Sequence, residues 1–396
     1  MPPSSDSMEP IELLSYGGKL GYITPDQFMK TEYAGALRRM LLDLTTIEQI
    51  YDFRDSGVFE DATNYPAIVT LEREDDTTVR ETNQIRYARV KSNIEDGSRN
   101  LDERIVETVN NRMDQPGYSD EFIDVFDFPQ SELSSGFWAL MPPEEKEVFD
   151  KLERQSDAVI GNVTDSVFHA TSTSANKIYV VEVLNADRIE PADSGRTVMV
   201  SPTGSPKQFE VETDLLRPFL KGDDVEQWSA DWSGLHLLHP YRVIRENDEI
   251  TEVKFCSEEY LNDNLPLTLQ YYRAYKDELE ARERGRKRGE DNWYAYIYDK
   301  NLSKFENRKI VQKHISEEAQ YMIDQTGMWH FTTAYGILLK EEYREMTDEI
   351  LCQLNAKPLD FYFKNHIQHQ SWRVLRIPRT VRRTRSLRRL RRRFAL

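Results

Sequence analysis

The stretch Gly18–Leu71, GKLGYITPDQFMKTEYAGALRRMLLDLTTIEQIYDFRDSGVFEDATNYPAIVTL, decides the fold of the first part of the chain. Its segments 19–23, 47–53 and 67–71 are short and apolar, as buried strands are. The loop 57–66 separates the last two of them, and the residues after the first segment follow a helical pattern. We therefore predict a strand, a helix, a strand, a loop and a strand, which together form a piece of an α/β domain.

The predicted helix has a recognisable start. The hydroxyl of Thr24 can accept a backbone N–H, Pro25 suits the first helical position, and Gln27 can reach back to the cap. Apolar residues at helical spacing then form one face of the helix, namely Tyr33, Leu37, Leu41 and Leu44.

The composition indicates a globular protein with room for two domains. Of its 396 residues, 39% are hydrophobic and 31% are charged, which is enough for sizeable cores. No run approaches the roughly 20 apolar residues that span a bilayer, and the Pro/Ser-rich start lacks a signal-peptide core. The two cysteines, Cys256 and Cys352, indicate no disulfide framework. These features predict a cytoplasmic protein without a membrane partner.

The charge is acidic overall but unevenly distributed. The net charge is −17, and the last 26 residues hold 11 arginines and no acidic residue, so residues 1–370 carry −28. This is unusual for a DNA-binding protein, because contacts with phosphates normally supply much of the affinity. Either the basic residues concentrate in one groove, or the protein works in a high-salt cytoplasm.

Several segments resemble, in order and spacing, the C-terminal half of TaqI-like, adenine-specific DNA methyltransferases, including the fused type IIG restriction–modification proteins. The segments cover most of the chain and are GGKLGYITPDQF (17–28), IYDFRDSGVFEDATNYPAIVTL (50–71), TSTSANKIYVV (171–181), VETDLLRPFLKGDDVEQW (211–228), LHLLHPY (235–241), LPLTLQYYRAYKDELEARERGRKRGEDNWYAY (265–296), KNLSKFENRKIVQKHIS (300–316), YMIDQTGMWHFTTAYGILL (321–339) and EILCQLNAKPLDFYFK (349–364).

The resemblance implies an α/β fold at the start, the end of a Rossmann-like methyltransferase domain, followed by an α+β target-recognition domain. The implied boundaries are 1–85 for the catalytic part, 86–148 for a connecting region and 149–370 for the TaqI-like DNA-specificity domain. In that family the intact enzyme uses S-adenosylmethionine, binds double-stranded DNA and flips its target adenine. The resemblance thus implies a site-specific adenine methyltransferase of a restriction–modification system.

Two motifs of that family are absent from this sequence. No Asn-Pro-Pro occurs, although the family's catalytic motif is Asn-Pro-Pro-Tyr/Phe, and no glycine-rich turn after a strand could cradle the methyl donor. We therefore expect a fragment that is inactive and binds no cofactor alone, unless a separate chain supplies the N-terminal methyltransferase half. The alternatives are a non-enzymatic DNA-specificity subunit that docks on a separate methyltransferase chain, or a degenerate gene product.

The loop GVFEDATNYP (57–66) is the part of this chain that the resemblance places nearest the chemistry. Methylating a base amine requires taking the base out of the stack and holding it against a flat apolar surface. In the family an aromatic residue of this region forms one wall of that pocket. Phe59 fits best by position and Tyr65 second. The alternative is that Phe59 fills the domain core.

The segment 265–296 contains the first group of candidate DNA-binding residues. Helical spacing predicts a buried face formed by Leu269, Tyr272, Tyr275 and Leu279. Acidic residues four positions earlier can pair with Arg282, Arg284 and Lys287 along the helix. Those pairs favour a solvated helix face for Arg282 and Arg284.

Arg286 and Arg288 lack such helical partners, so we expect them to contact phosphates. The predicted DNA-binding residues of this segment are Arg286, Lys287, Arg288 and Trp293, although alternate residues of 293–296 should point into the core. A second group flanks the strand 309–313 and consists of Lys304, Arg308, Lys309 and Lys313. A solvated face is the alternative for this group. Weaker candidates are Lys207, Arg217 and Lys221.

The histidine pairs and the C-terminal tail are two further candidates for functional sites. The pairs His236/His239 and His366/His369 have a spacing that metal ligands can have, but no third ligand follows in a recognisable pattern, so we predict no metal site. The Arg-rich tail, 371–396, is either a nucleic-acid arm or the product of a shifted reading frame. A frameshifted tail should be disordered.

Overall fold

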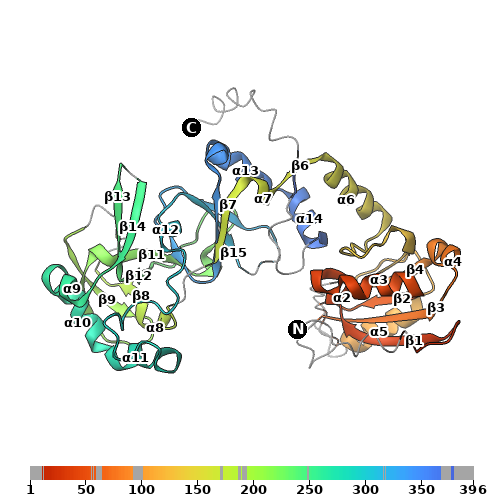
Figure 1. The fold of residues 1–396 in the computed structure, drawn as a ribbon, viewed down its shortest axis with the longest axis horizontal. Coiled ribbons are helices and arrows are strands. Elements are labelled where there is room, and N and C mark those ends of the chain that lie inside the picture. Colours follow the sequence, from red (N-terminus) through yellow and green to blue (C-terminus); the bar gives the residue numbers. More distant parts are fainter. Residues whose placement is uncertain are drawn as a thin grey trace. The chain divides into compact units, whose positions relative to one another are not determined.

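The computed structural model describes residues 11, 13–54, 56, 58, 65–91, 101–169, 173–185, 189, 194–247, 249–314, 316, 318–366 and 376–378. The chain divides into two units, which are described separately (Figure 1). Unit 1 contains residues 1–155 and 361–371, and unit 2 contains residues 156–360 and 372–396. Within the described residues, no helix combines the length and the apolar composition that crossing a membrane requires.

Unit 1 is built on a five-stranded mixed sheet with the order β1-β3-β2-β4-β5. Its strands are β1 (Lys19–Pro25), β2 (Thr45–Asp52), β3 (Pro66–Arg73), β4 (Gln84–Val90) and β5 (Ile123–Pro129). β2 and β4 run parallel, and the other neighbouring strands run antiparallel. The three strands predicted from the opening stretch are confirmed. β4 and β5 lie largely within 86–148, so this region completes the sheet of unit 1 and is not the connection that we expected.

Helices cover both faces of this sheet (Figure 1). On one face, Leu41 of α3 (Gly35–Leu44) packs in one cluster with Ile50 of β2. On the other face, Ile105 of α5 (Leu101–Arg112) packs in a second cluster with Ala88 of β4. Successive residues of a strand point to opposite faces, so β2, β3, β4 and β5 each contribute to both clusters. Unit 1 is therefore a three-layer α/β/α structure.

The predicted start of the first helix is wrong. β1 continues through Pro25, the short helix α2 (Gln27–Lys30) follows, and the chain is extended at Thr31 before α3 begins. Buried Arg38 explains the break, because its guanidinium donates to the carbonyls of Phe28 and Thr31, both at 2.8 Å. These carbonyls would bond within the helix if the helix were continuous.

Unit 2 contains a six-stranded sheet, a four-stranded sheet and two strand pairs. The sheet orders are β10-β9-β8-β12-β11-β17 and β16-β15-β18-β7, and the pairs are β13-β14 and β19-β6. The bounds are β6 Ser156–Val159, β7 Thr164–His169, β8 Val180–Val183, β9 Thr197–Pro202, β10 Phe209–Glu212, β11 Leu216–Leu220, β12 Leu235–Leu238, β13 Tyr241–Glu246, β14 Glu249–Phe255, β15 Lys309–Lys313, β16 Tyr321–Asp324, β17 His330–Phe331, β18 Ala334–Leu339 and β19 Arg376–Pro378.

The remaining α-helices are α4 Thr77–Thr82, α6 Pro143–Gln155, α7 Ile160–Val163, α8 Asn176–Tyr179, α9 Glu258–Asn264, α10 Pro266–Ala274, α11 Lys276–Gly285, α12 Leu302–Phe305, α13 Thr347–Leu354 and α14 Lys357–His366. The predicted apolar face of 265–296 is buried in the main core of unit 2. Of the Arg-rich tail, the described part is β19, which pairs antiparallel with β6. This strand differs from the expectation that the tail lacks structure.

Candidate nucleic-acid interface

A short loop at the end of α11 carries Arg284 and three of the candidate DNA-binding residues, Arg286, Lys287 and Arg288, and we call residues 283–289 the basic loop. Helical geometry ends at Arg282, and the next three residues all have positive φ angles, namely 47° at Glu283, 62° at Arg284 and 83° at Gly285. Positive φ is strained for residues with a side chain, so a strong tertiary contact must hold this turn. The predicted helical pairs of Arg282, Arg284 and Lys287 therefore do not form.

Buried Arg282 supplies that contact. Its guanidinium donates to four backbone carbonyls at 2.7–2.9 Å, which belong to Thr173, Leu279, Trp293 and Ala295. It also lies 5.4 Å from the centre of the Tyr179 ring. The prediction of a solvated Arg282 is wrong. Arg282 thus joins the end of α11 to Thr173 and to the segment 293–295 that follows the basic loop. These contacts fix the base of the loop.

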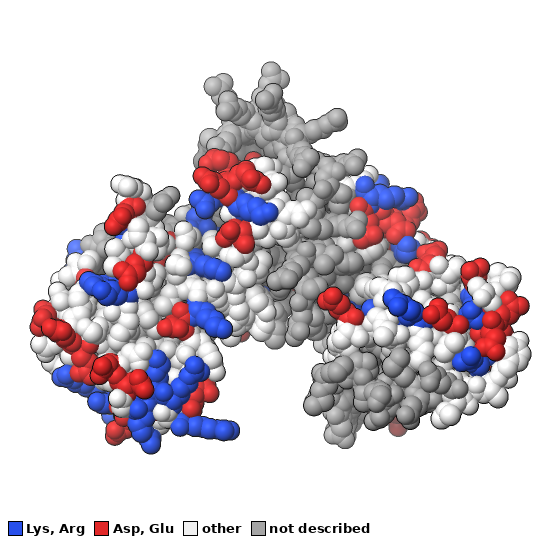
Figure 2. Space-filling model, in the orientation of Figure 1, with Lys and Arg blue, Asp and Glu red and all other residues white. Residues whose placement is uncertain are grey.

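The side chains of the basic loop face solvent. Arg284, Arg286 and Arg288 are exposed and Lys287 is half-buried. The guanidinium of Arg286 lies 5.3 Å from the centre of the Tyr298 ring. None of these four cations forms an ion pair with the described part of the chain. Figure 2 shows Lys and Arg side chains gathered over the end of unit 2 where Figure 1 places α11.

A cleft of about 490 Å³ lies next to Arg282, which anchors this loop. Thr173, which accepts from Arg282 through its carbonyl, also donates its hydroxyl to Asn176 at 2.6 Å. Asn176 lines the cleft together with two lysines, Lys221 and Lys313. Other polar lining residues are Thr203, Asp223, His314, Thr332 and Thr333. The cleft therefore offers ammonium, hydroxyl and amide groups, which are the groups that contact phosphates and base edges.

Two predicted DNA-binding residues are buried, so their assignment is wrong. The Lys309 side chain is completely buried, and its ammonium donates to the Asp324 carboxylate and to the carbonyl of Phe305. Burial lowers the pKa of Lys309, and the ion pair with Asp324 offsets part of this effect. Trp293 is also buried and donates its indole N–H to Glu258 at 2.7 Å. Neither side chain can reach a phosphate.

The other candidates of the second group remain at the surface but have partners. Arg308 donates to the carbonyl of Arg344 and the hydroxyl of Thr347, both at 3.1 Å. The Lys304 ammonium lies 5.8 Å from the centre of the Phe168 ring, and Lys313 pairs with Asp223 at 3.4 Å. Of this group, only Lys313 lines the cleft. Among the predicted DNA-binding residues that the structure describes, Arg286, Lys287, Arg288 and Lys304 form no ion pair, and the first three lie together in the basic loop.

Of the two residues predicted to line the target-base pocket, the structure describes only Tyr65. Phe59 lies outside the described residues, so its role stays a prediction. Tyr65 is half-buried directly before β3, and its carbonyl accepts from the backbone N–H of Asp26 at 2.8 Å. This bond holds the end of the loop 57–66 beside the end of β1.

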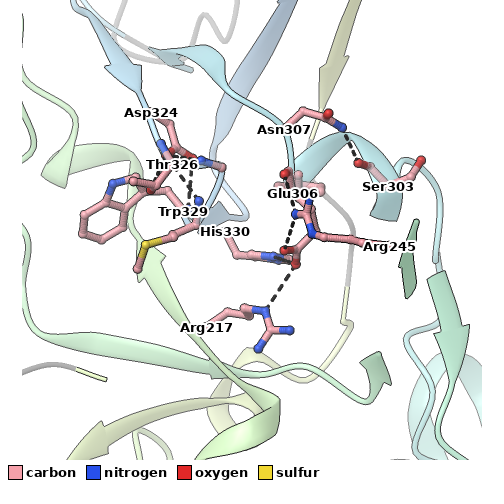
Figure 3. Close-up of polar contacts among 12 residues, drawn as sticks. Arg217, Arg245, Ser303, Glu306, Asn307, Asp324, Thr326, Trp329 and His330 are labelled. Atoms are coloured by element: carbon pink, nitrogen blue, oxygen red, sulfur yellow. Dashed lines mark hydrogen bonds and ion pairs between the residues drawn. The ribbon is translucent and has the colours of Figure 1, made fainter. Parts of the chain in front are cut away.

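Two buried carboxylates organise the interior of unit 2 (Figure 3). Asp324 accepts from the backbone N–H groups of the turn that follows β16, including Gly327 at 2.9 Å and Trp329 at 3.0 Å. Glu306 accepts from His330 Nε2 at 3.1 Å and from Arg217 Nε at 3.2 Å. Burial alone would raise the pKa of Glu306, but the hydrogen bond from His330 and the charge of Arg217 outweigh it and lower the pKa.

Two histidines lie close to Glu306 in a group that was not predicted from the sequence. Within the described residues, His239, Glu306 and His330 form a group whose potential ligand atoms all lie within 4.8 Å of one another. The three residues belong to β17 and to the segments after β12 and α12, so no local spacing could reveal the group. Burial lowers the pKa of both imidazoles, and the hydrogen bond with Glu306 offsets part of the effect at His330.

The chain is similar in sequence to methyltransferases of restriction–modification systems. Residues 9–59 match the model of the Eco57I restriction–modification methylase family. Type II methyltransferase M.BstVI of Geobacillus stearothermophilus is 24% identical over 58% of this chain and 36% of that protein. Type II restriction enzyme and methyltransferase RM.Eco57I of Escherichia coli is 22% identical over 79% of this chain and 28% of that protein.

Among solved structures, the type IIL restriction–modification enzyme MmeI, in complex with DNA, aligns with 91% of this chain and 37% of its own, at 9% identity and a TM-score of 0.44. The chain spans about a third of the length of the two curated relatives. This sequence therefore resembles part of the type II methyltransferases of restriction–modification systems.

Proposed function

We propose that this chain provides DNA target recognition for a site-specific, adenine-specific DNA methyltransferase of a restriction–modification system. Unit 2 would be the target-recognition domain, with double-stranded DNA bound at the basic loop and the adjoining cleft. The observation that carries the proposal is the basic loop, in which four cations form no ion pair with the described residues, on a base fixed by buried Arg282. Such cations can neutralise phosphates on an otherwise acidic protein.

Methyl transfer with S-adenosylmethionine would then depend on residues outside this chain. We propose that a separate methyltransferase chain supplies them. The first strand of unit 1 supports it. β1 lies at the edge of its sheet, and its neighbouring residues Tyr22 and Ile23 are 47% and 53% exposed. Neighbouring strand residues point to opposite faces, so β1 presents apolar surface on both faces beside an open edge. Such an edge is suited to accept a strand from a partner.

The DNA-binding proposal predicts a salt-dependent loss of affinity when the basic loop is neutralised. Replacing Arg286 and Arg288 by alanine should reduce the slope of log affinity against log salt by about 1.8, since each phosphate contact contributes about 0.9. At 0.1 M salt the same relation gives a roughly 60-fold weaker affinity. Fluorescence anisotropy with a duplex at several salt concentrations measures both quantities. The unmodified chain and the double variant both carry the arginines of 371–396. The difference between their DNA affinities therefore reports on the basic loop.

Arg273→Ala is the matched control, because Arg273 is an exposed arginine of α10 that pairs with Glu258 at 2.7 Å. Its slope should equal that of the unmodified chain. If the loop variant keeps the same affinity and slope as this control, the basic loop is a solvated surface and DNA does not bind there.

If a separate chain supplies the methyltransferase half, the purified chain should not bind the methyl donor. The sequence contains no Asn-Pro-Pro and no glycine-rich turn after a strand, which are the features that would hold the target amine and the donor. Isothermal titration calorimetry with S-adenosylmethionine should therefore show no saturable heat. A binding curve with micromolar affinity would place a complete donor site in this chain and refute this part of the proposal.

A further inference from the structure

The cluster of His239, Glu306 and His330 is not used by the proposed DNA-binding function. It lies in the interior of unit 2, where both imidazoles are almost fully buried. The nitrogen atom His239 Nε2 is buried and has no hydrogen-bond partner among the residues that the structure describes. A buried polar atom without a hydrogen-bond partner costs free energy. Such an atom in a folded protein therefore suggests a bound ligand or ion.

His239 is fixed in the state that a metal ligand requires. The Tyr296 hydroxyl lies 3.2 Å from the carbonyl of Leu238 and donates to it, and the same oxygen lies 3.2 Å from His239 Nδ1. Since the hydroxyl proton is already used, Nδ1–H donates to the hydroxyl oxygen, and Nε2 keeps a free lone pair. Metal-binding histidines are typically held in this way, with the second nitrogen donating to an oriented acceptor.

Glu306 and His330 are close to the spacing of two ligands of one ion. Their Oε1 and Nε2 atoms are 3.1 Å apart, while ligand atoms of a tetrahedral zinc ion with bonds near 2.0–2.1 Å lie about 3.3 Å apart. The His330 ring stacks on Phe305, with 4.9 Å between ring centres, which limits its rotation. The His239 and His330 ring centres are 4.7 Å apart.

We propose that His239, Glu306 and His330 bind one divalent transition-metal ion, with zinc as the best match. Two imidazoles and one carboxylate form a ligand set that zinc accepts, and a fourth position stays open for water. His239 would bind through Nε2, Glu306 through a carboxylate oxygen and His330 through Nε2. On binding, the Nε2 proton that His330 donates to Glu306 moves to Nδ1, so Nε2 presents a lone pair to the metal. Nδ1–H is then a buried donor without an acceptor among the described residues, which weakens the site.

The charges around Glu306 set the strength of this site. Arg217 and Arg245 lie 3.2 and 3.8 Å from the oxygens of the Glu306 carboxylate, so a cation must share one negative charge with two guanidinium groups. We therefore expect weaker binding than in structural zinc sites with thiolate ligands. The ion would join the segment after β12, the segment after α12 and the strand β17, and so act as a cross-link within unit 2.

Metal binding is tested on the full-length chain without an affinity tag. After loading with zinc and gel filtration, mass spectrometry of the metal should find about one ion per chain, because a specific site saturates at one equivalent. Cobalt titration should produce the visible absorption of a four-coordinate ion. Both signals should be lost in His239→Ala and in Glu306→Gln. They should persist in His236→Ala, since His236 is a buried histidine of β12 outside the cluster.

Arg217→Gln provides a second readout that does not require losing a ligand. Removing the nearest competing cation should tighten cobalt binding by about tenfold or more, because a positive charge 3.2 Å from the carboxylate opposes the binding of a second cation. The proposal is overturned if the unmodified chain yields no cobalt spectrum, or if the metal content of His239→Ala equals that of His236→Ala. Neither result depends on DNA binding, so the proposed function is tested separately.

Discussion

Replacing Asp324 by alanine should lower the free energy of unfolding by about 3–5 kcal/mol, the range for removing one partner of a buried ion pair. Both side chains of the Lys309–Asp324 pair are 0% exposed, so the variant leaves a buried ammonium without its carboxylate. The turn after β16 also loses the acceptor of its backbone N–H groups, among them those of Gly327 and Trp329. Urea unfolding monitored by circular dichroism measures the difference.

The matched control for this experiment is Asp223→Ala. Asp223 also pairs with a lysine of β15, Lys313 at 3.4 Å, but its side chain is 94% exposed. Solvent-exposed ion pairs contribute little to stability, so this variant should change the free energy of unfolding by less than about 0.5 kcal/mol. If Asp324→Ala costs no more than the control, the buried ion pair does not stabilise unit 2.

Lys309 illustrates why a basic run in the sequence does not by itself identify a basic surface. Lys304, Arg308, Lys309 and Lys313 form a basic run in the sequence, and lysines usually face solvent. Lys309 opens β15 with its side chain toward the core, where the carboxylate of Asp324 on the antiparallel neighbour β16 compensates it. The sequence contains both residues but no sign that they are opposite each other. The register of the two strands decides that.

The second half of segment 265–296 shows the same limit for helices. The periodicity of Leu269, Tyr272, Tyr275 and Leu279 correctly predicted a buried helical face. It did not show that α10 ends before Tyr275 or that helical geometry ends at Arg282. The second break is held by the carbonyl of Thr173, a residue 109 positions away. Local acid–base spacing favoured a longer helix, and a tertiary contact overrode it.

The first strands were predictable for the opposite reason. β2 and β3 draw their pattern from short-range apolar runs that the final packing uses unchanged. Arg286 and Arg288 were also singled out from local spacing, because neither has an acidic residue four positions earlier. The histidine cluster could not be found in this way, since His239, Glu306 and His330 meet only through the packing of unit 2.

Replacing Arg282 by methionine should cost about 3 kcal/mol or more of stability, because four buried carbonyls lose their donors at once. Arg282→Lys should recover only part of this loss, since an ammonium cannot reproduce the planar fork that serves carbonyls on several segments. The loss should also weaken DNA binding by the remaining folded protein, because Arg282 fixes the base of the basic loop without itself reaching the surface.

Arg284→Met is the control that separates these two effects. Arg284 is an exposed member of the basic loop, so its replacement should leave stability within about 0.5 kcal/mol and reduce the salt slope of DNA binding by about 0.9. Arg282→Met should therefore lower the stability against urea much more than Arg284→Met does. Both variants should weaken DNA binding. If Arg282→Met unfolds like Arg284→Met, the carbonyls around Arg282 are satisfied in another way. The left-handed turn at residues 283–285 must then be held by other contacts.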